Sequence, residues 1–235
     1  MLGILKALFD SKGDSHPLIT EACGRLTSML AETKDLLEKA VPWLLNKETP
    51  SELLAEARSV DKRSNKSERE IRKLLVEALA FNHYDGAICL VLMSAAKDGE
   101  RLVDECRNLL DIGALVDTPI PESYGARLKE HTGTLIGLVD ETRSAFAKND
   151  EAKAIDLVEG EKPFIAALNV IQDEILNDTS LTPRQAIVVS RAFRYLHRIR
   201  AHLANIASTV VFPVHQIDFA KRSYVQQAKN RLKDD

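Results

Sequence analysis

The residues with the clearest chemical potential form a row of oxygen donors at helical spacing. Glu100, Asp104 and Asn108 follow one another at intervals of four residues, so in a helix they lie on one face, one turn apart. Two neighbouring carboxylates repel each other unless a positive charge lies between them, and either a hard or borderline metal ion or an arginine would supply it. Asp61 and Asn65, one turn apart in a stretch without apolar side chains, are the best donors from a second helix. The spacing predicts a metal site formed by Asp61, Glu100, Asp104 and Asn108, although the same spacing also occurs on solvated helix faces.

The stretch around these residues occurs twice in the chain. Residues 100–109 align with residues 197–206, at an offset of 97, and apolar positions upstream align as well. A repeat of this length indicates two similar supersecondary units that bury apolar faces against each other. In the second copy His197 and Ala201 replace both carboxylates, so no second metal site is expected there.

The second copy is rich in arginine instead. No Asp or Glu occurs from Thr179 to Ile217, whereas five arginines do. One hypothesis pairs these arginines with carboxylates of residues 150–177, in the space that corresponds to the metal site. Another makes Arg194, His197 and Arg198 an anion site for phosphate, a nucleotide or an acidic loop of a partner protein. A third leaves the arginines on a solvated face.

Six long helices are expected to position these residues. Apolar side chains recur at three- and four-residue spacing over residues 18–46, 53–79, 84–112, 122–148, 150–177 and 182–212. Pro42 should bend or end the first helix, and Pro163 should kink the fifth. The charged residues 221–235 are expected to form a loosely held seventh helix.

No segment alternates between apolar and polar residues as a strand would. The predicted fold class is therefore all-α, with two tandem three-helix bundles and a C-terminal helical tail. The predicted units are residues 15–117, residues 118–215 and a tail of residues 216–235. The boundary between the two bundles is placed at Thr118 to Pro121.

Composition narrows the class of function. The chain has 235 residues, 45% of them hydrophobic, and a net charge of −3, which gives no bias toward nucleic acid. No apolar run approaches the roughly 20 residues that span a bilayer. The expected location is the cytoplasm, with attachment to the inner face of the cytoplasmic membrane left open. The three cysteines, far apart among apolar residues, indicate reduced thiols.

The repeated Glu-Arg-x-x-Asp-x-x-x-Asn motif, placed on the third and sixth helices, resembles the PhoU family of phosphate-signalling proteins. Residues 60–65 followed by residues 70–75 look like the second helix of the family, and residues 154–161 look like the fifth. The resemblance covers about residues 20–215. The second repeat departs from the family pattern where both carboxylates are lost.

The resemblance implies a pair of three-helix bundles whose acidic motifs hold metal clusters, here a divalent or ferric ion in the first repeat. It also implies negative regulation of phosphate uptake through a membrane phosphate transporter or a sensor kinase, and it leaves a homodimer open. An enzyme is not expected, because no nucleophile elbow or phosphate-cradling glycine loop is present. The alternative is a metal-free helical interaction module with no phosphate role.

Overall fold

The segments with helical periodicity in the sequence form long helices in the structure. The computed structural model describes residues 17–46, 51–81, 86–115, 120–219 and 221–234. Its helices are α2 (Pro17–Asn46), α3 (Ser51–Phe81), α4 (Gly86–Gly113), α5 (Glu122–Lys148), α6 (Glu151–Glu159), α7 (Glu161–Asn177), α8 (Pro183–Val211), η2 (Val214–Gln216) and α9 (Arg222–Asp234). The described residues form no strand, which confirms the all-α prediction. None of the described helices is long and apolar enough to cross a membrane.

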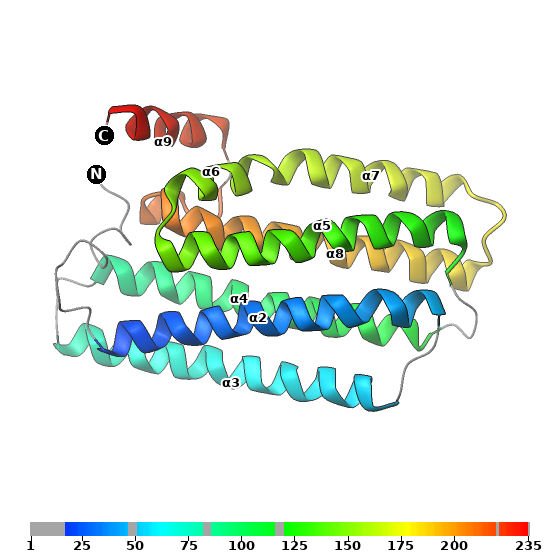
Figure 1. Cartoon of the computed structure of the whole chain (residues 1–235), viewed down its shortest axis with the longest axis horizontal. Coiled ribbons are helices and arrows are strands. Elements are labelled where there is room, and N and C mark those ends of the chain that lie inside the picture. The colour runs from blue at the N-terminus through cyan, green and yellow to red at the C-terminus, as the bar shows by residue number, and fades with distance from the viewer. Residues whose placement is uncertain (1–16, 47–50, 82–85, 116–119, 220, 235) are drawn as a thin grey trace.

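The helices form two groups with nearly parallel long axes (Figure 1). One group contains α2, α3 and α4, and the other contains α5, α8 and the α6–α7 pair. The groups meet where α4 packs on α8 and α2 packs on α5, and their buried apolar side chains form one continuous core. This confirms the tandem three-helix arrangement. The predicted boundary at Thr118 to Pro121 falls partly outside the described residues, so the division into units at that point stays a prediction.

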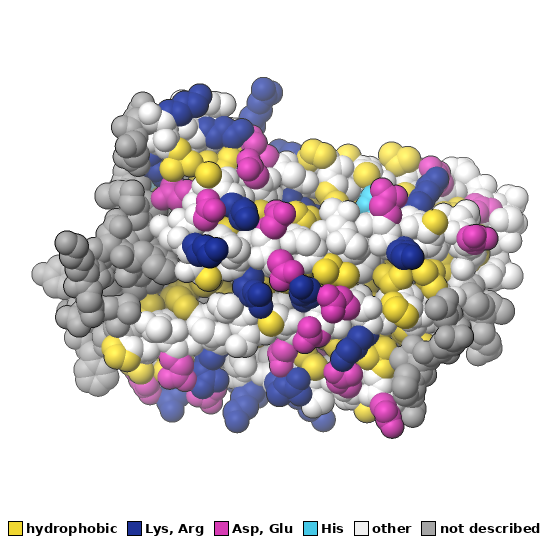
Figure 2. All heavy atoms as spheres, viewed as in Figure 1, with side chains coloured by type: hydrophobic (Ala, Val, Ile, Leu, Met, Phe, Trp, Pro, Cys, Tyr) yellow, Lys and Arg dark blue, Asp and Glu magenta, His cyan; other side chains and the backbone are white. Residues whose placement is uncertain are grey.

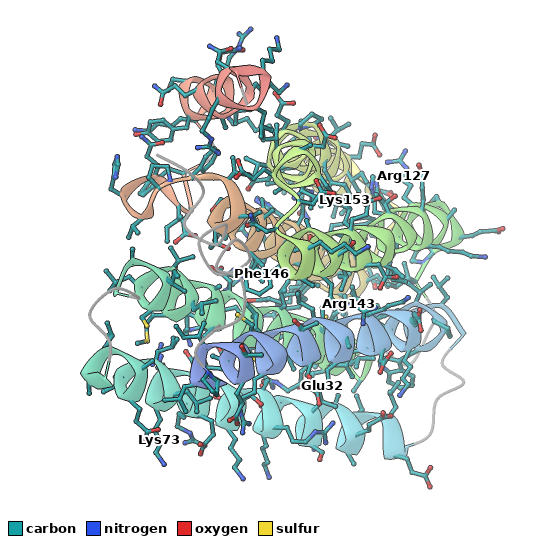
Figure 3. All side chains as sticks on the ribbon, turned by 60° about the vertical axis from the view of Figure 1, so that its left-hand side comes forward. Glu32, Lys73, Arg127, Arg143, Phe146 and Lys153 are labelled. Carbon is teal, nitrogen blue, oxygen red and sulfur yellow. The ribbon has the colours of Figure 1, made fainter. Side chains whose placement is uncertain are left out.

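Charged side chains on the surface also join the helices. Nζ of Lys34 on α2 lies 2.6 Å from Oδ2 of Asp140 on α5, and Figure 3 shows Arg143 of α5 beside α2. Nε of Arg63 on α3 lies 3.0 Å from Oε1 of Glu32 on α2. These partly exposed ion pairs add little stability each, so the apolar core holds the helices together.

Equivalent helices of the two groups keep the register of the repeat. α4 begins at Gly86 and α8 at Pro183, 97 residues apart. The aligned apolar residues, Val91 with Val188 and Leu102 with Ile199, are all buried. The apolar face of the repeated helix therefore has the same role in both copies.

The fifth predicted helix is broken, and proline is the cause. α6 ends at Glu159 and α7 begins at Glu161, so Pro163 lies in the first turn of α7. A proline cannot donate to the carbonyl four residues earlier, and its ring pushes against that carbonyl. Here the carbonyl belongs to Glu159, so the distortion falls at Gly160. The predicted kink is confirmed, at a position upstream of the proline itself.

By contrast, α2 continues past Pro42 to Asn46, so that proline does not end the helix.

The C-terminal helix is docked, and the prediction that it is loosely held was wrong. Val225 and Ala228 of α9 are buried, and α9 packs against α6 (Figure 1). Arg231 binds the Glu151 side chain and donates to the Val211 carbonyl oxygen at 3.1 Å. The prediction weighed the many charges of this segment and missed its narrow apolar contact.

Gly99 lies where α4 approaches α2 closely. A Cβ atom at residue 99 would lie 2.6 Å from Cδ1 of Leu26 and 3.2 Å from Cε of Met29, and both side chains are buried. Neither side chain has free space to move into, because protein cores are close-packed. The absence of a side chain at this position therefore permits the close approach of the two helices there.

We expect Gly99→Ala to destabilise the protein. The methyl group would overpack the contact at a cost of about 1–3 kcal/mol, which exceeds the gain of about 1 kcal/mol from better helix propensity. Urea unfolding would measure the change. Gly133→Ala on α5 is the matched control, because nothing lies within 4 Å of its Cβ position, and it should stabilise the protein. A Gly99→Ala variant as stable as the Gly133→Ala variant would contradict the close approach.

Candidate functional site: two charged seams on α4

The predicted oxygen donors meet around the guanidinium group of Arg107 on α4. Nη2 of Arg107 lies 2.6 Å from Oδ1 of Asp104 and 2.9 Å from Oδ1 of Asn108. Nη1 donates to Oδ2 of Asp111 at 3.1 Å, and Nε lies 3.6 Å from Oδ1 of Asp61 on α3. We call these five residues the acidic seam. The structure thus brings Asp61, Asp104 and Asn108 together, with an arginine between them.

Glu100, the remaining predicted donor, belongs to a neighbouring charge cluster one turn earlier on α4. Its side chain is buried, and its Oε2 lies 2.8 Å from Nζ of Lys97 and 3.7 Å from Nε of Arg101. Lys97 also lies 3.6 Å from Oε1 of Glu68 on α3, and Arg101 lies 3.6 Å from Oδ2 of Asp104. Every carboxylate of the predicted row therefore has a cationic neighbour from the same chain.

Burial raises the pKa of Asp61, Arg107 opposes the rise, and the carboxylates of Asp104, Glu100 and Asp111 add to it. The neighbouring carboxylates therefore disfavour ionisation of Asp61, and Arg107 supplies the positive charge that favours it.

The seam has the oxygen chemistry of a metal site, but its arrangement fits a metal ion poorly. Arg107 occupies the space between the carboxylates, and Asn65 uses its Nδ2 to donate to the backbone oxygen of Asp61 at 2.8 Å. Over the ranges that the structure describes, no three His, Cys, Asp or Glu side chains converge as metal ligands. Of the two cations that the sequence left open, the geometry favours arginine. Metal binding by Asp61, Glu100, Asp104 and Asn108 stays a prediction.

A second seam runs between α4 and α8, where the two groups of helices meet. Nη2 of Arg198 lies 2.7 Å from Oε1 of Glu105, whose side chain is only 1% exposed. The contact is an ion pair without the alignment of a hydrogen bond, because neither Glu105 oxygen has a hydrogen-bond partner. Burial raises the pKa of Glu105, and Arg198 opposes the rise. Arg198 is therefore the cation that most favours the ionised form of this buried carboxylate.

Two turns away, buried Asp98 on α4 completes the inter-group seam. Its Oδ1 lies 2.7 Å from Nδ1 of His202 and 3.0 Å from Nδ2 of Asn205, both on α8. We call Asp98, Glu105, Arg198, His202 and Asn205 the inter-group seam. Sequence reasoning missed Asp98 and Glu105. A usable signal was present, because the two acids are seven residues apart on the buried side of α4.

The three residues predicted as an anion site are engaged in different ways. Nη1 of Arg194 lies 3.2 Å from Nδ1 of His197, whereas Arg198 turns to Glu105. Burial and then the charge of Arg194 lower the pKa of His197, so its ring is neutral and accepts the hydrogen bond from Arg194. Whether these residues bind an anion stays a prediction.

The proposed pairing of α8 with the acids of residues 150–177 is not realised as ion pairs within the described part of the chain. Glu161 interacts with Arg200 only as a nearby charge, which opposes the lowering of the Arg200 pKa. Arg200 is fully buried on the opposite side from Arg198, and it donates to the Leu157 carbonyl oxygen of α6 rather than to a carboxylate. Burial lowers the pKa of Arg200 to about 10. The arginines of α8 divide between α4, the backbone of α6 and the solvent.

Comparison with solved structures gives this chain a PhoU-like fold. It matches the crystal structure of PhoU from Pseudomonas aeruginosa with a TM-score of 0.75 and 22% identity, over 83% of this chain and 95% of that one. It matches the phosphate transport system regulatory protein PhoU from Streptococcus pneumoniae with a TM-score of 0.73 and 16% identity, over 86% and 96% of the two chains. No family model matches the sequence, and comparison with curated proteins finds no match. The predicted resemblance in fold is confirmed.

We expect Arg198→Ala to destabilise the protein by about 2 kcal/mol at neutral pH, below the range for fully buried pairs because Arg198 is partly exposed. Without Arg198 the pKa of Glu105 rises further. A carboxyl with a raised folded-state pKa binds its proton more tightly in the folded protein, so stability falls as pH rises from the unfolded pKa through the folded one. The penalty should therefore be largest at neutral pH and shrink toward pH 4.5, the ordinary pKa of Glu.

Urea unfolding at several pH values would measure this penalty. Arg191→Ala is the matched control, because Arg191 is exposed on the same helix and forms no ion pair with a described residue. A penalty for Arg198→Ala that does not change between neutral and acidic pH would show that the ion pair with Glu105 is not its cause.

Metal analysis of protein purified without chelator would test the acidic seam. Because Arg107 neutralises the carboxylates, we expect equally low metal content in the wild type and in Glu100→Ala/Asp104→Ala. Arg107→Gln should raise the metal content, since it frees Asp61, Asp104 and Asp111 to bind a cation. More metal in the wild type than in Glu100→Ala/Asp104→Ala would instead support the metal site that the spacing predicts.

Proposed function

We propose that this chain regulates phosphate uptake by binding another protein, either a membrane phosphate transporter or its associated sensor kinase. The observation that carries the proposal is the fold, which is shared over most of both chains with two PhoU proteins, one of them described as a phosphate transport system regulatory protein. In this proposal the protein acts in the cytoplasm and reaches the inner face of the membrane through its partner.

The charge arrangement also favours a second candidate, a metal-free helical interaction module without a phosphate role. Arg107 supplies the positive charge of the acidic seam from within the chain, so the helices need no metal ion to pack. Both candidates act through protein contact. They differ in whether that contact regulates the uptake of phosphate by the cell.

The test is deletion of the gene in its own host, followed by measurement of phosphate uptake and of a phosphate-starvation reporter in phosphate-rich medium. We expect both to rise in the deletion strain, because a negative regulator has been lost, and to return to normal when the wild-type gene is restored. A Lys62→Glu gene is the matched control, because this exposed side chain of α3 forms no ion pair with a described residue.

Unchanged uptake and an unchanged reporter in the deletion strain would refute the phosphate role. The metal-free interaction module would then be the remaining candidate.

A further inference from the structure

The outer face of α8 carries a straight row of arginines. Arg184, Arg191, Arg194 and Arg198 follow at intervals of seven, three and four residues, and all four are exposed. At 100° per residue they share an arc of about 80°, and the row is about 21 Å long. Ile187, 53% exposed, lies on the same arc. We call these five residues the arginine ridge.

Most of the ridge has no acidic partner. Within the described part of the chain, Arg184, Arg191 and Arg194 form no ion pair, and Arg198 alone pairs with a carboxylate, that of Glu105. α8 itself contains no Asp, Glu or Lys. Like charges one turn apart destabilise a helix, so the fold gains nothing from the charges of Arg184, Arg191 and Arg194. The face shown in Figure 2 differs, because basic and acidic side chains are interspersed there.

The opposite faces of α8 hold the ridge in place. Val188, Ala192, Leu196 and Ile199 are buried in the core, and Arg200 is fixed on α6. The backbone that carries the four guanidinium groups is therefore rigid. Because the row is already rigid, this protein loses little conformational entropy when a partner binds to it.

The chemistry of the ridge selects the class of partner. Guanidinium groups form planar, two-pronged pairs with carboxylates, which lysine cannot form. The arginines are spread along a line rather than gathered in a pocket, so they do not converge on a single phosphate. The ridge is also one residue wide on a chain with a net charge of −3, which repels a broad anionic membrane surface. A narrow, straight carboxylate-bearing element fits best.

We propose that the arginine ridge docks an acidic helix of a partner protein, whose carboxylates recur at the spacing of Arg184, Arg191, Arg194 and Arg198, with Ile187 as the apolar contact. Two packed helices at a small crossing angle stay in contact over the length of this row. This inference rests on the proposed function in one respect only, because it assumes that the partner is a protein.

The probe is a synthetic helical peptide with four glutamates at intervals of seven, three and four residues, together with its reversed-order version for the antiparallel orientation. Binding is measured by fluorescence anisotropy on the full-length protein. We expect one of the two orders to bind, and Arg191→Glu/Arg194→Glu to weaken it about tenfold or more. Arg198 is left intact because it also neutralises Glu105. Lys62→Glu/Arg69→Glu on α3 is the matched control, with the same charge change at exposed positions, and should bind like the wild type.

Charge exchange makes the test specific for the register. A peptide with lysines in place of the two facing glutamates should bind Arg191→Glu/Arg194→Glu and not the wild type. Equal binding of a peptide with the same composition in scrambled order would overturn the proposal in favour of diffuse attraction. Binding to vesicles of phosphatidylcholine and phosphatidylglycerol through Arg191 and Arg194, without peptide binding, would overturn it in favour of a membrane. None of these outcomes depends on phosphate, so the proposed function is tested separately.

Discussion

Buried charged side chains fix the position of α8 against α4. The packing of the two groups of helices depends on that contact. Glu105 and Asp98 are almost inaccessible to water, and each meets a polar group of α8, Arg198 in one case and His202 in the other. A buried carboxylate without its partner is strongly destabilising. Sliding α8 by one turn would break both contacts at once, whereas apolar side chains alone would tolerate such a slip more easily. The polar pairs therefore specify the register of the two groups of helices.

The two copies of the repeated helix have diverged into members of opposite charge that now bind each other. Arg101 and Arg198 occupy equivalent positions, and both reach carboxylates of α4, the first within its own helix and the second across the interface. α4 carries five acidic residues, and α8 carries none. The two copies are thus electrostatically complementary inside one chain, which favours the pairing of unlike copies over like ones.

The sequence predicted the helices well because their apolar spacing is a local property. The break in the fifth helix also followed from one residue type, although its place depended on which carbonyl the Pro163 ring displaces. The charge partners could not be predicted this way. Asp98, Glu105 and Arg107 look like ordinary solvated residues until the rotation of α4 and the approach of α8 are known, since an ion pair depends on both helices. The acids at 61 and 104 were placed together correctly, but which cation lies between them depends on the direction of the Arg107 side chain.

Arg231 gives the C-terminal helix a role beyond covering α6. Its guanidinium group binds both Glu151, at the start of α6, and the carbonyl oxygen of Val211, in the last turn of α8, where the helix has no backbone donor of its own. One side chain of α9 therefore binds both the first residue of α6 and the last residue of α8. An excised rear half that stops after α8 would lack this tie and would expose the apolar side chains that Val225 and Ala228 cover. A fragment that keeps both contacts of Arg231 therefore has to include the last helix.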